Sequence, residues 1–564
     1  MRSEEMTKKR VCMGVAPDLG FKRVQSLLRA ISELFPVDFV PVGEACHAAI
    51  IKGIIELRGD GVDGCVAGVV NVPRLLYDPG TGAATIRRSP KVEFRALSSL
   101  NTCLRGQCME DSDVSSFIPL APVEGGEIVG SMEGCAFWIR QGSGQSSTDV
   151  VALDLPTLGA GGQLLDYFQP GRFVRLLPLL EFIRVRTSKV DWDPGPFRAC
   201  FVFDDPSLVR PRFGCLDFRE LASHARAYGY HAAIAMVPLD AVHAGNEAVE
   251  IFRKNPKHLS LIVHGNDHTY LELVNCSSDG GRLALLAQAL RRIEAFERCH
   301  GMVVDRVMEP PHGGVARAMF PAMAALGFEA ALTTAHHLFH FDPMESWPCC
   351  LGMDMAEVMP GGIATIPRIR MLPDWRTAAV LAGFLRQPIV IAGHHQDVAE
   401  GFGFLAEFAQ MVAGFGPVRW LSPTGIARTN FKVRREGSCL LVKTYQRRVF
   451  VLIPDGVDQI MVERAWVTEN ESERLTVESR ATVPMFSGVC GRVSPSFQVN
   501  TGDTLDIKSF FRQPVSAQEI PPPPRRLWPV ARRLLTGTRD HCYSWLYPRS
   551  QLSAFNERLL NTQS

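Results

Sequence analysis

The chain has 564 residues, of which 46% are hydrophobic and 21% are charged, and its formal net charge is +1. This length is too great for one hydrophobic core and predicts roughly three domains at ~150 residues each. A net charge so close to zero excludes the overall basic excess of a nucleic-acid-binding protein, so we expect no nucleic-acid partner.

The chain begins MRSEEMTKKRVCMGVAPDLG, which has no apolar signal core. Its most apolar stretch, residues 173–185, is interrupted by charges and a proline, whereas a membrane-spanning helix needs about 20 apolar residues. The 15 cysteines include no CxxC pair, so neither a zinc ribbon nor a thioredoxin-like site is indicated. We therefore expect a cytoplasmic protein with reduced thiols.

Residues 1–190 are expected to form a mixed α/β domain of unknown role. Residues 9–17 have the pattern of a strand and a turn, and residues 21–35 repeat apolar side chains at helical spacing. The glycine-rich stretch at 158–162 matches neither GxGxxG nor GxxxxGK[ST], so no nucleotide site is predicted.

Residues 196–429 alternate apolar strands with helical segments, after a turn-rich boundary at 189–197. A long helix is expected over 280–301, with a glycine at its end. This alternation predicts a mostly parallel α/β sheet, either a barrel or a doubly wound sheet. Six strands are expected, near residues 199–203, 231–238, 259–264, 303–310, 328–334 and 388–395.

The chain changes character near residue 430. Residues 430–515 have strand patterns without helical periods, which predicts a β-rich, sandwich-like domain. Residues 516–564 begin with a proline-rich linker and continue as a basic tail. The tail has the pattern of a helix that contacts a membrane surface or a partner, or of a solvated tail. Its alternating basic and apolar residues are Arg525, Arg526, Leu527, Trp528, Arg532, Arg533, Leu534, Leu535 and Arg539.

Four predicted strands of residues 196–429 are followed by polar, reactive residues. These are Asp204-Asp205, HGNDH at 264–268, EPPHGG at 309–314 and GHHQD at 393–397. Parallel strands place their carboxyl ends on one face of a sheet, so we expect these acids and imidazoles to gather there. Two adjacent carboxylates repel each other unless a cation or a proton offsets their charge. The Asp-Asp pair therefore predicts either a metal site or a solvated strand tip.

His264 and His268 form an HxxxH pair, and the spacing of one helical turn would place both imidazoles on the same side, as two metal ligands require. A second pair, His336 and His340, shows that the spacing alone is weak evidence. The position of the first pair, after an apolar strand and downstream of the two aspartates, favours it as the metal site.

The order FDD, HxxxH, PPxG and an apolar strand ending in histidine resembles the NodB-homology polysaccharide deacetylases of carbohydrate esterase family 4. The resemblance covers residues 197–429. It implies a distorted (β/α) barrel and a single divalent metal ion, with zinc expected. It also implies removal of an acyl group, typically N-acetyl, from a carbohydrate or a sugar-containing precursor, which in the cytoplasm would be nucleotide- or lipid-linked.

The resemblance implies a role for each matching residue. Asp204 matches the general base, and Asp205, His264 and His268 match the metal ligands. The backbone N–H of His312 matches the donor to the oxyanion.

The general acid matches His394 or His395, and we prefer His394 because it comes first after the apolar run. Asp397 is placed either to hold the other nitrogen of that imidazole or to be an ordinary surface acid.

Two departures from the family pattern bear on activity. Pro206 stands where the first motif ends in glycine, and Glu309 stands where an arginine orients the catalytic aspartate. Another cation, such as Arg368 or Arg370, would have to take that place, and His336 and His337 are further candidates to enter the site. Two other functions stay open: a metal amidohydrolase acting on a small non-sugar amide, and an inactive protein that binds glycan or partners.

Overall fold

The computed structural model describes residues 9–42, 51–58, 72–80, 84–85, 89–343, 346–468, 471–479, 484–510, 515–524 and 527–546. The chain divides into two compact units. The first contains Met1–Asp193, Ser346–Asp354 and Pro373–Arg386, and the second contains Pro194–Glu345, Met355–Leu372 and Gln387–Ser564.

The first unit is built on a nine-stranded mixed sheet, in the order β2-β1-β3-β4-β11-β10-β9-β6-β7. The helix expected at 21–35 is present as α2 (Asp18–Leu34), which buries its apolar side chains. The unit also contains α3 (Leu177–Thr187) and α9 (Trp375–Phe384). The strands are β1 (Val11–Ala16), β2 (Val37–Pro41), β3 (Ile51–Leu57), β4 (Arg74–Tyr77), β6 (Lys91–Phe94), β7 (Cys108–Glu110), β9 (Gly126–Met132), β10 (Cys135–Gln141) and β11 (Thr148–Val151).

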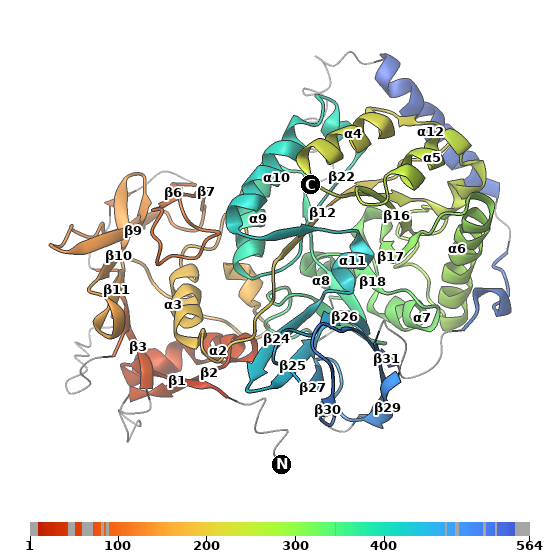
Figure 1. Cartoon of the computed structure of the whole chain (residues 1–564). Coiled ribbons are helices and arrows are strands. Elements are labelled where there is room, and N and C mark those ends of the chain that lie inside the picture. The colour runs from red at the N-terminus through yellow and green to blue at the C-terminus, as the bar shows by residue number, and fades with distance from the viewer. Residues whose placement is uncertain are drawn as a thin grey trace. The chain divides into compact units, whose positions relative to one another are not determined.

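The second unit contains a ten-stranded sheet whose strand order is β19-β20-β18-β17-β16-β15-β12-β22-β21, with β23 also paired to β12 (Figure 1). All its pairings are parallel except that of β19 with β20, so the predicted parallel sheet and its six strands are confirmed. The strands are β12 (Phe197–Asp204), β15 (Ala232–Met236), β16 (Leu259–His264), β17 (Asp305–Glu309), β18 (Ala330–Leu332), β19 (Glu357–Met359), β20 (Ile363–Ile366), β21 (Arg368–Arg370), β22 (Ile389–Gly393) and β23 (Val418–Trp420).

Helices lie between these strands along the chain. The long helix predicted over 280–301 is α6 (Asp279–His300), whose first turn is capped by the Ser278 hydroxyl and whose end is marked by Gly301 at φ 60°. The other helices are α4 (Phe218–Tyr228), α5 (Asn246–Lys254), α7 (Phe320–Ala325), α8 (Ala335–Phe341), α10 (Gly403–Phe415) and α11 (Pro423–Ala427). A short hairpin, β13 (Arg212–Phe213) and β14 (Leu216–Asp217), follows β12.

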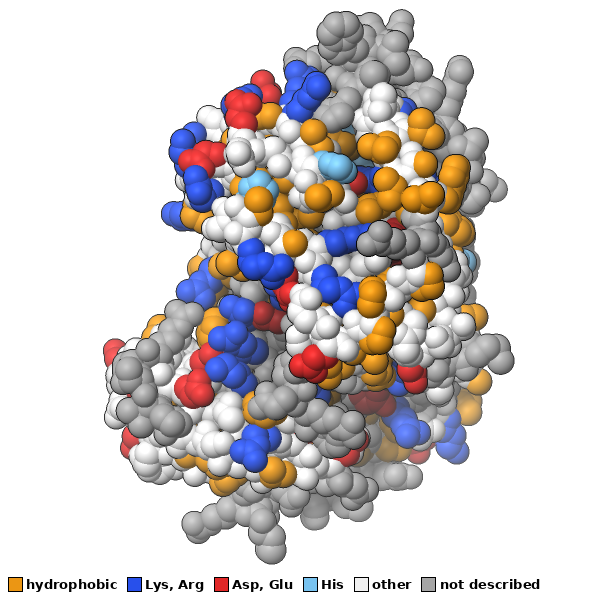
Figure 2. Space-filling view, turned by 90° about the vertical axis from the view of Figure 1, so that its right-hand side faces the viewer, with side chains coloured by type: hydrophobic (Ala, Val, Ile, Leu, Met, Phe, Trp, Pro, Cys, Tyr) orange, Lys and Arg blue, Asp and Glu red, His pale blue; other side chains and the backbone are white. Residues whose placement is uncertain are grey.

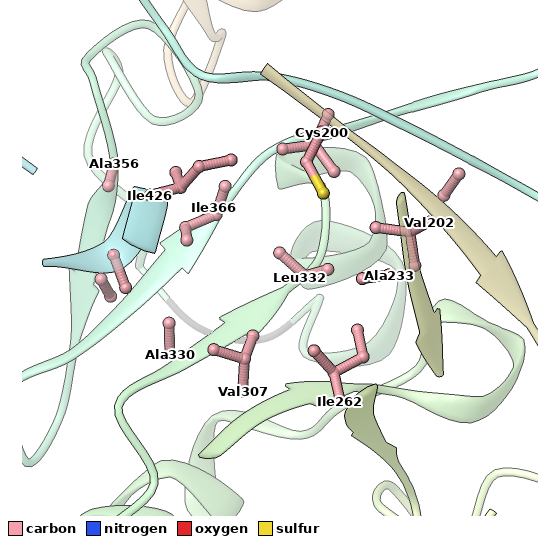
Figure 3. Close-up of a cluster of buried hydrophobic side chains, with 14 of the residues drawn as sticks. Cys200, Val202, Ala233, Ile262, Val307, Ala330, Leu332, Ala356, Ile366 and Ile426 are labelled. Atoms are coloured by element: carbon pink, nitrogen blue, oxygen red, sulfur yellow. The ribbon is translucent and has the colours of Figure 1, made fainter. Parts of the chain in front are cut away.

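The inner faces of these strands enclose one hydrophobic cluster (Figure 3). Alternate residues of β12, β15, β18, β20 and β22 contribute to it, as the two-residue period of a strand requires. Many are small, so the strands approach closely around the core. The cluster includes Cys200, Val202, Ala233, Ile262, Val307, Ala330, Leu332 and Ile366. On the other face, the Phe201 ring packs against Tyr230, Phe408 and Trp420, with centroids 4.9–5.4 Å away.

The β-rich segment after residue 430 forms two four-stranded sheets, β24-β25-β27-β30 and β26-β31-β28-β29, within the second unit. Buried residues of both sheets share one cluster, which includes Val442, Val449, Leu475 and Ile507. The strands are β24 (Phe431–Glu436), β25 (Cys439–Thr444), β26 (Arg448–Leu452), β27 (Gln459–Arg464), β28 (Glu473–Ser479), β29 (Pro484–Cys490), β30 (Phe497–Gln498) and β31 (Thr504–Phe510).

The basic C-terminal segment contains a helix, α12 (Leu527–Leu546). Two of the arginines noted in the sequence, Arg525 and Arg526, lie outside the described residues. Within the described ranges, no helix combines the length and the apolar character needed to cross a bilayer.

Candidate active site

A pocket of about 540 Å³ opens where β12, β16 and β22 end. The register explains why the strand tips meet, since His264 pairs with Glu309 and Phe203 pairs with Gly393. Side chains just beyond these pairs therefore lie at the same level of the sheet. The pocket is lined by all seven site residues named from the sequence: Asp204, Asp205, His264, His268, His312, His394 and His395.

Three of these side chains are close enough to share one metal ion. Donor atoms of Asp205, His264 and His268 all lie within 4.8 Å of one another. Oδ1 of Asp205 is 3.8 Å from Nε2 of His264 and 3.1 Å from Nε2 of His268. Two imidazole nitrogens and one carboxylate oxygen suit a borderline divalent ion such as zinc, so the residues fit the metal that the resemblance implies.

The histidines are in the neutral form that a metal requires. Burial lowers the pKa of His264 to about 4 and that of His268 to about 3. Nδ1 of His264 lies 2.8 Å from the backbone carbonyl of Glu309, which can only accept, so Nδ1 carries the proton. The lone pair of His264 is then on Nε2, the nitrogen that faces Asp205.

The two histidines are not on a helix, contrary to the interpretation of the HxxxH spacing. His264 ends β16, and His268 follows in an irregular loop. Gly265 at φ 62° and His268 at φ 54° turn this loop back on itself. The buried carboxylate of Glu272 accepts hydrogen bonds from the backbone N–H groups of 266, 267 and 268 at 2.7–3.1 Å. Glu272 thus holds the loop in place, a role that no sequence signal indicated.

The adjacent aspartates both face the site because the backbone leaves the strand conformation between them. Neighbouring side chains of a strand point to opposite faces, but Asp205 has φ 80°, in the left-handed region. Burial opposes ionisation of Asp205, yet His268, His264 and Arg533 together hold its pKa below the usual value. Asp205 is therefore a carboxylate, as a ligand must be.

Backbone strain is concentrated in this pocket. Seven non-glycine residues of the described chain have a positive φ, and three of them are Asp205, His268 and His312. Such conformations cost on the order of 1–3 kcal/mol each and tend to cluster at functional sites. Their gathering in one pocket is thus a sign of function that is independent of the sequence motifs.

Arg368 provides the positive charge beside Asp204 that the resemblance predicts at position 309, where this chain has Glu309. Its guanidinium is 3.1 Å from Oδ2 of Asp204 and also pairs with the carboxyl group of Glu309. Burial raises the pKa of Glu309 well above its usual value, and the pKa of Asp204 rises less. Burial therefore disfavours ionisation most strongly at Glu309, while the Arg368 guanidinium favours the charged form of both carboxyls. The other oxygen of Asp204, Oδ1, has no hydrogen-bond partner among the described residues.

The two consecutive histidines have different surroundings. The side chain of His394 is 55% exposed, with Nε2 4.0 Å from Oδ2 of Asp205. His395 is buried, stacks edge-on against Phe213, and accepts a 3.4 Å hydrogen bond from the backbone of Cys215 at Nδ1. Asp397 accepts from the backbone N–H of His394 at 2.7 Å, so it caps the loop.

The PPHG turn brings His312 to the pocket, with its ring centroid 5.1 Å from that of His268. Gly313, at φ 69°, must be glycine, because a Cβ there would lie 2.3 Å from the ring of His337. His337 lines the pocket, as considered from the sequence, and burial lowers its pKa to about 4. His336 does not line it and is exposed.

The C-terminal helix α12 also reaches this site. Arg533 is buried and lies 3.2 Å from Oδ1 of Asp205 and 2.5 Å from Oδ2 of Asp240. Arg532 donates to the backbone carbonyl of His268 at 2.5 Å. The basic residues of the tail were noted in the sequence, but nothing there indicated contact with the aspartates.

No protein-family model matches this chain, and neither does any curated protein. Solved structures that it resembles include a protein from Mycobacterium smegmatis assigned as a polysaccharide deacetylase (16% identity, TM-score 0.31, covering 42% of this chain and 92% of the other). A family 4 carbohydrate esterase from Streptomyces lividans (14%, 0.26, 41% and 95%) and a peptidoglycan deacetylase from Bacillus subtilis (12%, 0.20, 39% and 93%) are two others.

These similarities are low in identity and cover about two fifths of the chain. The site geometry therefore has to support the functional argument by itself. These three structures are described as a polysaccharide deacetylase, a family 4 carbohydrate esterase and a peptidoglycan deacetylase.

Proposed function

We propose that this chain is a metal-dependent hydrolase that removes an acyl group, typically N-acetyl, from a carbohydrate or a sugar-containing precursor. The observation that carries this proposal is the geometry of one pocket. A donor set of two neutral imidazoles and a carboxylate lies beside a second carboxylate, Asp204, that is not part of that set. Catalysis of hydrolysis needs a Lewis acid next to a general base, and the pocket has a place for each.

Asp205, His264 and His268 would hold the ion, with zinc expected. Three protein ligands are typical of catalytic zinc, since structural sites use four. The bound ion would supply a Lewis acid and a positive charge next to the scissile carbonyl.

Asp204 is proposed as the general base. Arg368 holds its Oδ2 and favours the ionised carboxylate, while Oδ1 is left for a proton donor. Asp204 would take a proton from the water that attacks the amide carbon. Arg368 acts through Asp204 and is therefore a positioning residue.

His312 is proposed to stabilise the negative oxygen of the tetrahedral intermediate, and His394 is proposed to protonate the leaving amine. The backbone N–H of His312 would donate to the oxygen that becomes negative in the tetrahedral intermediate. Protonated His394, which is exposed to the pocket, would give its proton to the amine nitrogen as the carbon–nitrogen bond breaks. The products are a free acid and an amine. His395 is buried against Phe213 and has less access to a leaving group.

The zinc-loaded full chain should release acetate from N-acetylated amino-sugar oligomers. Asp204→Asn should lower the rate by about 10²–10⁴-fold, because it removes the general base. Acetate is measured by a coupled enzymatic assay, and the zinc content of both proteins is measured alongside. Release only from small non-sugar amides would move the substrate to that class. Zinc binding without turnover of any acylated compound would contradict a hydrolase.

Zinc binding should depend on the first HxxxH pair and not on the second. His264→Ala or His268→Ala should weaken zinc affinity by more than the ~10–100-fold that loss of an outer-shell partner costs, because a direct ligand is lost. The double variant His336→Ala/His340→Ala removes the same number of imidazoles and is the matched control. Elemental analysis after dialysis measures the retained zinc. Zinc loss in the control alone would place the ion elsewhere.

Arg368 and Glu309 should respond oppositely to substitution. Arg368→Ala should lower kcat about 10²-fold or more, since Asp204 loses its counter-charge, with partial rescue by Arg368→Lys. Glu309→Gln should keep activity within about threefold, because glutamine has the shape of the protonated acid. Steady-state kinetics and zinc content together separate positioning from misfolding. A Gln variant as inactive as Arg368→Ala would show that Glu309 must be charged.

Substitutions of the two adjacent histidines should affect different measured properties, the turnover rate for His394 and the stability of the fold for His395. His394→Ala should lower kcat by about 10²–10⁴-fold with little change in the unfolding midpoint, because the side chain is exposed. His395→Ala should instead lower the free energy of unfolding by about 0.5–3 kcal/mol, since the ring is buried against Phe213. Denaturant unfolding and acetate release measure the two effects. The reverse pattern would make His395 the acid.

A further inference from the structure

The pocket contains several arginines, and none of them belongs to the sequence motifs that supply its aspartates and histidines. Five arginines line it: Arg368 and Arg370 from β21, and Arg532, Arg533 and Arg539 from α12. The whole chain has a net charge of only +1, so this concentration is local. A concave site lined by one sign of charge concentrates ligands of the opposite sign.

Two of these arginines are matched by carboxyl groups. Arg368 pairs with Asp204 and Glu309, and Arg533 pairs with Asp205 and Asp240. These two guanidiniums therefore organise the catalytic acids and the metal ligand. Their positive charge is offset by these carboxyl groups of the protein itself.

Arg532 and Arg370 extend this charge to the mouth of the pocket. Arg532 donates to a backbone carbonyl, that of His268, which leaves its positive charge in place. Arg370 is exposed, and the two guanidiniums belong to different elements, α12 and β21. A divalent ion on Asp205 would add further positive charge to the same pocket. The mouth thus favours an anionic group next to the reacting amide.

We propose that the substrate is an acylated sugar carrying a phosphate group, and that Arg532 binds this phosphate together with Arg370. This inference rests on the proposed deacylase function and names its substrate class. A single guanidinium can bind a carboxylate through two parallel hydrogen bonds, whereas a phosphate presents more oxygens and up to two charges. Guanidiniums from two elements suit the larger anion.

The helix α12 also carries exposed apolar side chains, which bear on the source of the phosphate. At helical spacing, Arg532, Arg533 and Thr536 face the pocket. Leu527, Trp528, Leu534 and Leu535 of the same helix are 60–85% exposed. Figure 2 views the molecule from the side on which Figure 1 shows α6 and α12, and hydrophobic side chains are exposed on this face. The phosphate occurs both in soluble sugar phosphates and in lipid-linked sugars, and the experiment separates the two.

Calorimetric titration of the full chain with N-acetylglucosamine 1-phosphate and with N-acetylglucosamine tests the phosphate directly. The phosphorylated sugar should bind at least about tenfold more tightly, and Arg532→Ala should reduce this preference about tenfold, the effect of losing one charge-assisted contact. Arg532→Lys should retain part of it. Arg298→Ala removes an exposed arginine of α6 that does not line the pocket, and it should leave the preference unchanged.

Zinc attracts phosphate by itself, so the titrations are repeated after chelation, and the effect of Arg532→Ala should persist. Equal affinity for the two sugars, or a preference unaffected by Arg532→Ala, would overturn the inference. Acetate release from neutral sugars would in that case still support the deacylase. A phosphate preference without any acetate release would instead reject the deacylase and retain the anion site.

Binding to vesicles distinguishes a lipid-linked sugar phosphate from a soluble one. Co-sedimentation of the chain with vesicles containing phosphatidylglycerol, lost in Leu534→Ser/Leu535→Ser, supports a lipid-linked sugar phosphate. Phosphate-dependent binding of the soluble sugar without vesicle binding supports a soluble sugar phosphate.

Discussion

The arrangement of this site depends on keeping two adjacent carboxylates charged without letting their repulsion destabilise the fold. Asp204 and Asp205 end the same strand, and each is surrounded by its own cations or cation ligands. Arg368 faces Asp204, while two imidazoles and Arg533 face Asp205. The left-handed backbone at Asp205 makes this division of space achievable, because it breaks the alternation of the strand. This division is what the proposed mechanism needs, in which Asp205 would bind an ion while Asp204 acts as a base.

The Arg368–Glu309 pair shows that the position of a charge in space matters more than its position in the sequence. Glu309 ends β17, where the resemblance predicts an arginine, and Arg368 on β21 reaches the same aspartate from another strand. Burial then suppresses ionisation of Glu309, so the substitution does not invert the local charge. Asp204 thus has a guanidinium beside it, as the general base of the proposed mechanism requires.

The C-terminal helix extends the site beyond the segment that carries the motifs. Arg533 is 328 positions from Asp205 in the chain, yet its guanidinium contacts both the side chain and the backbone of that residue. The charge of the pocket is thus set jointly by the strand tips and by α12. A basic segment that resembled an ordinary tail is part of the wall of the pocket.

The sequence by itself determined which residues gather. Apolar runs ending in Asp204, His264 and His394 predicted parallel strands, and parallel strands bring their carboxyl ends to one edge whatever the details of the loops. Local periodicity also determined α2 and α6, since both helices are amphipathic and α6 carries clear end signals.

Only the tertiary structure decided how those residues are held. The loop that presents His268 is organised by Glu272 rather than by a helical turn, and the different surroundings of His394 and His395 come from the β13–β14 hairpin. Contacts such as Arg533 with Asp205 join residues far apart in the chain. Local sequence does not encode them, because they depend on how whole elements pack and on which charge remains after neighbouring charges are paired.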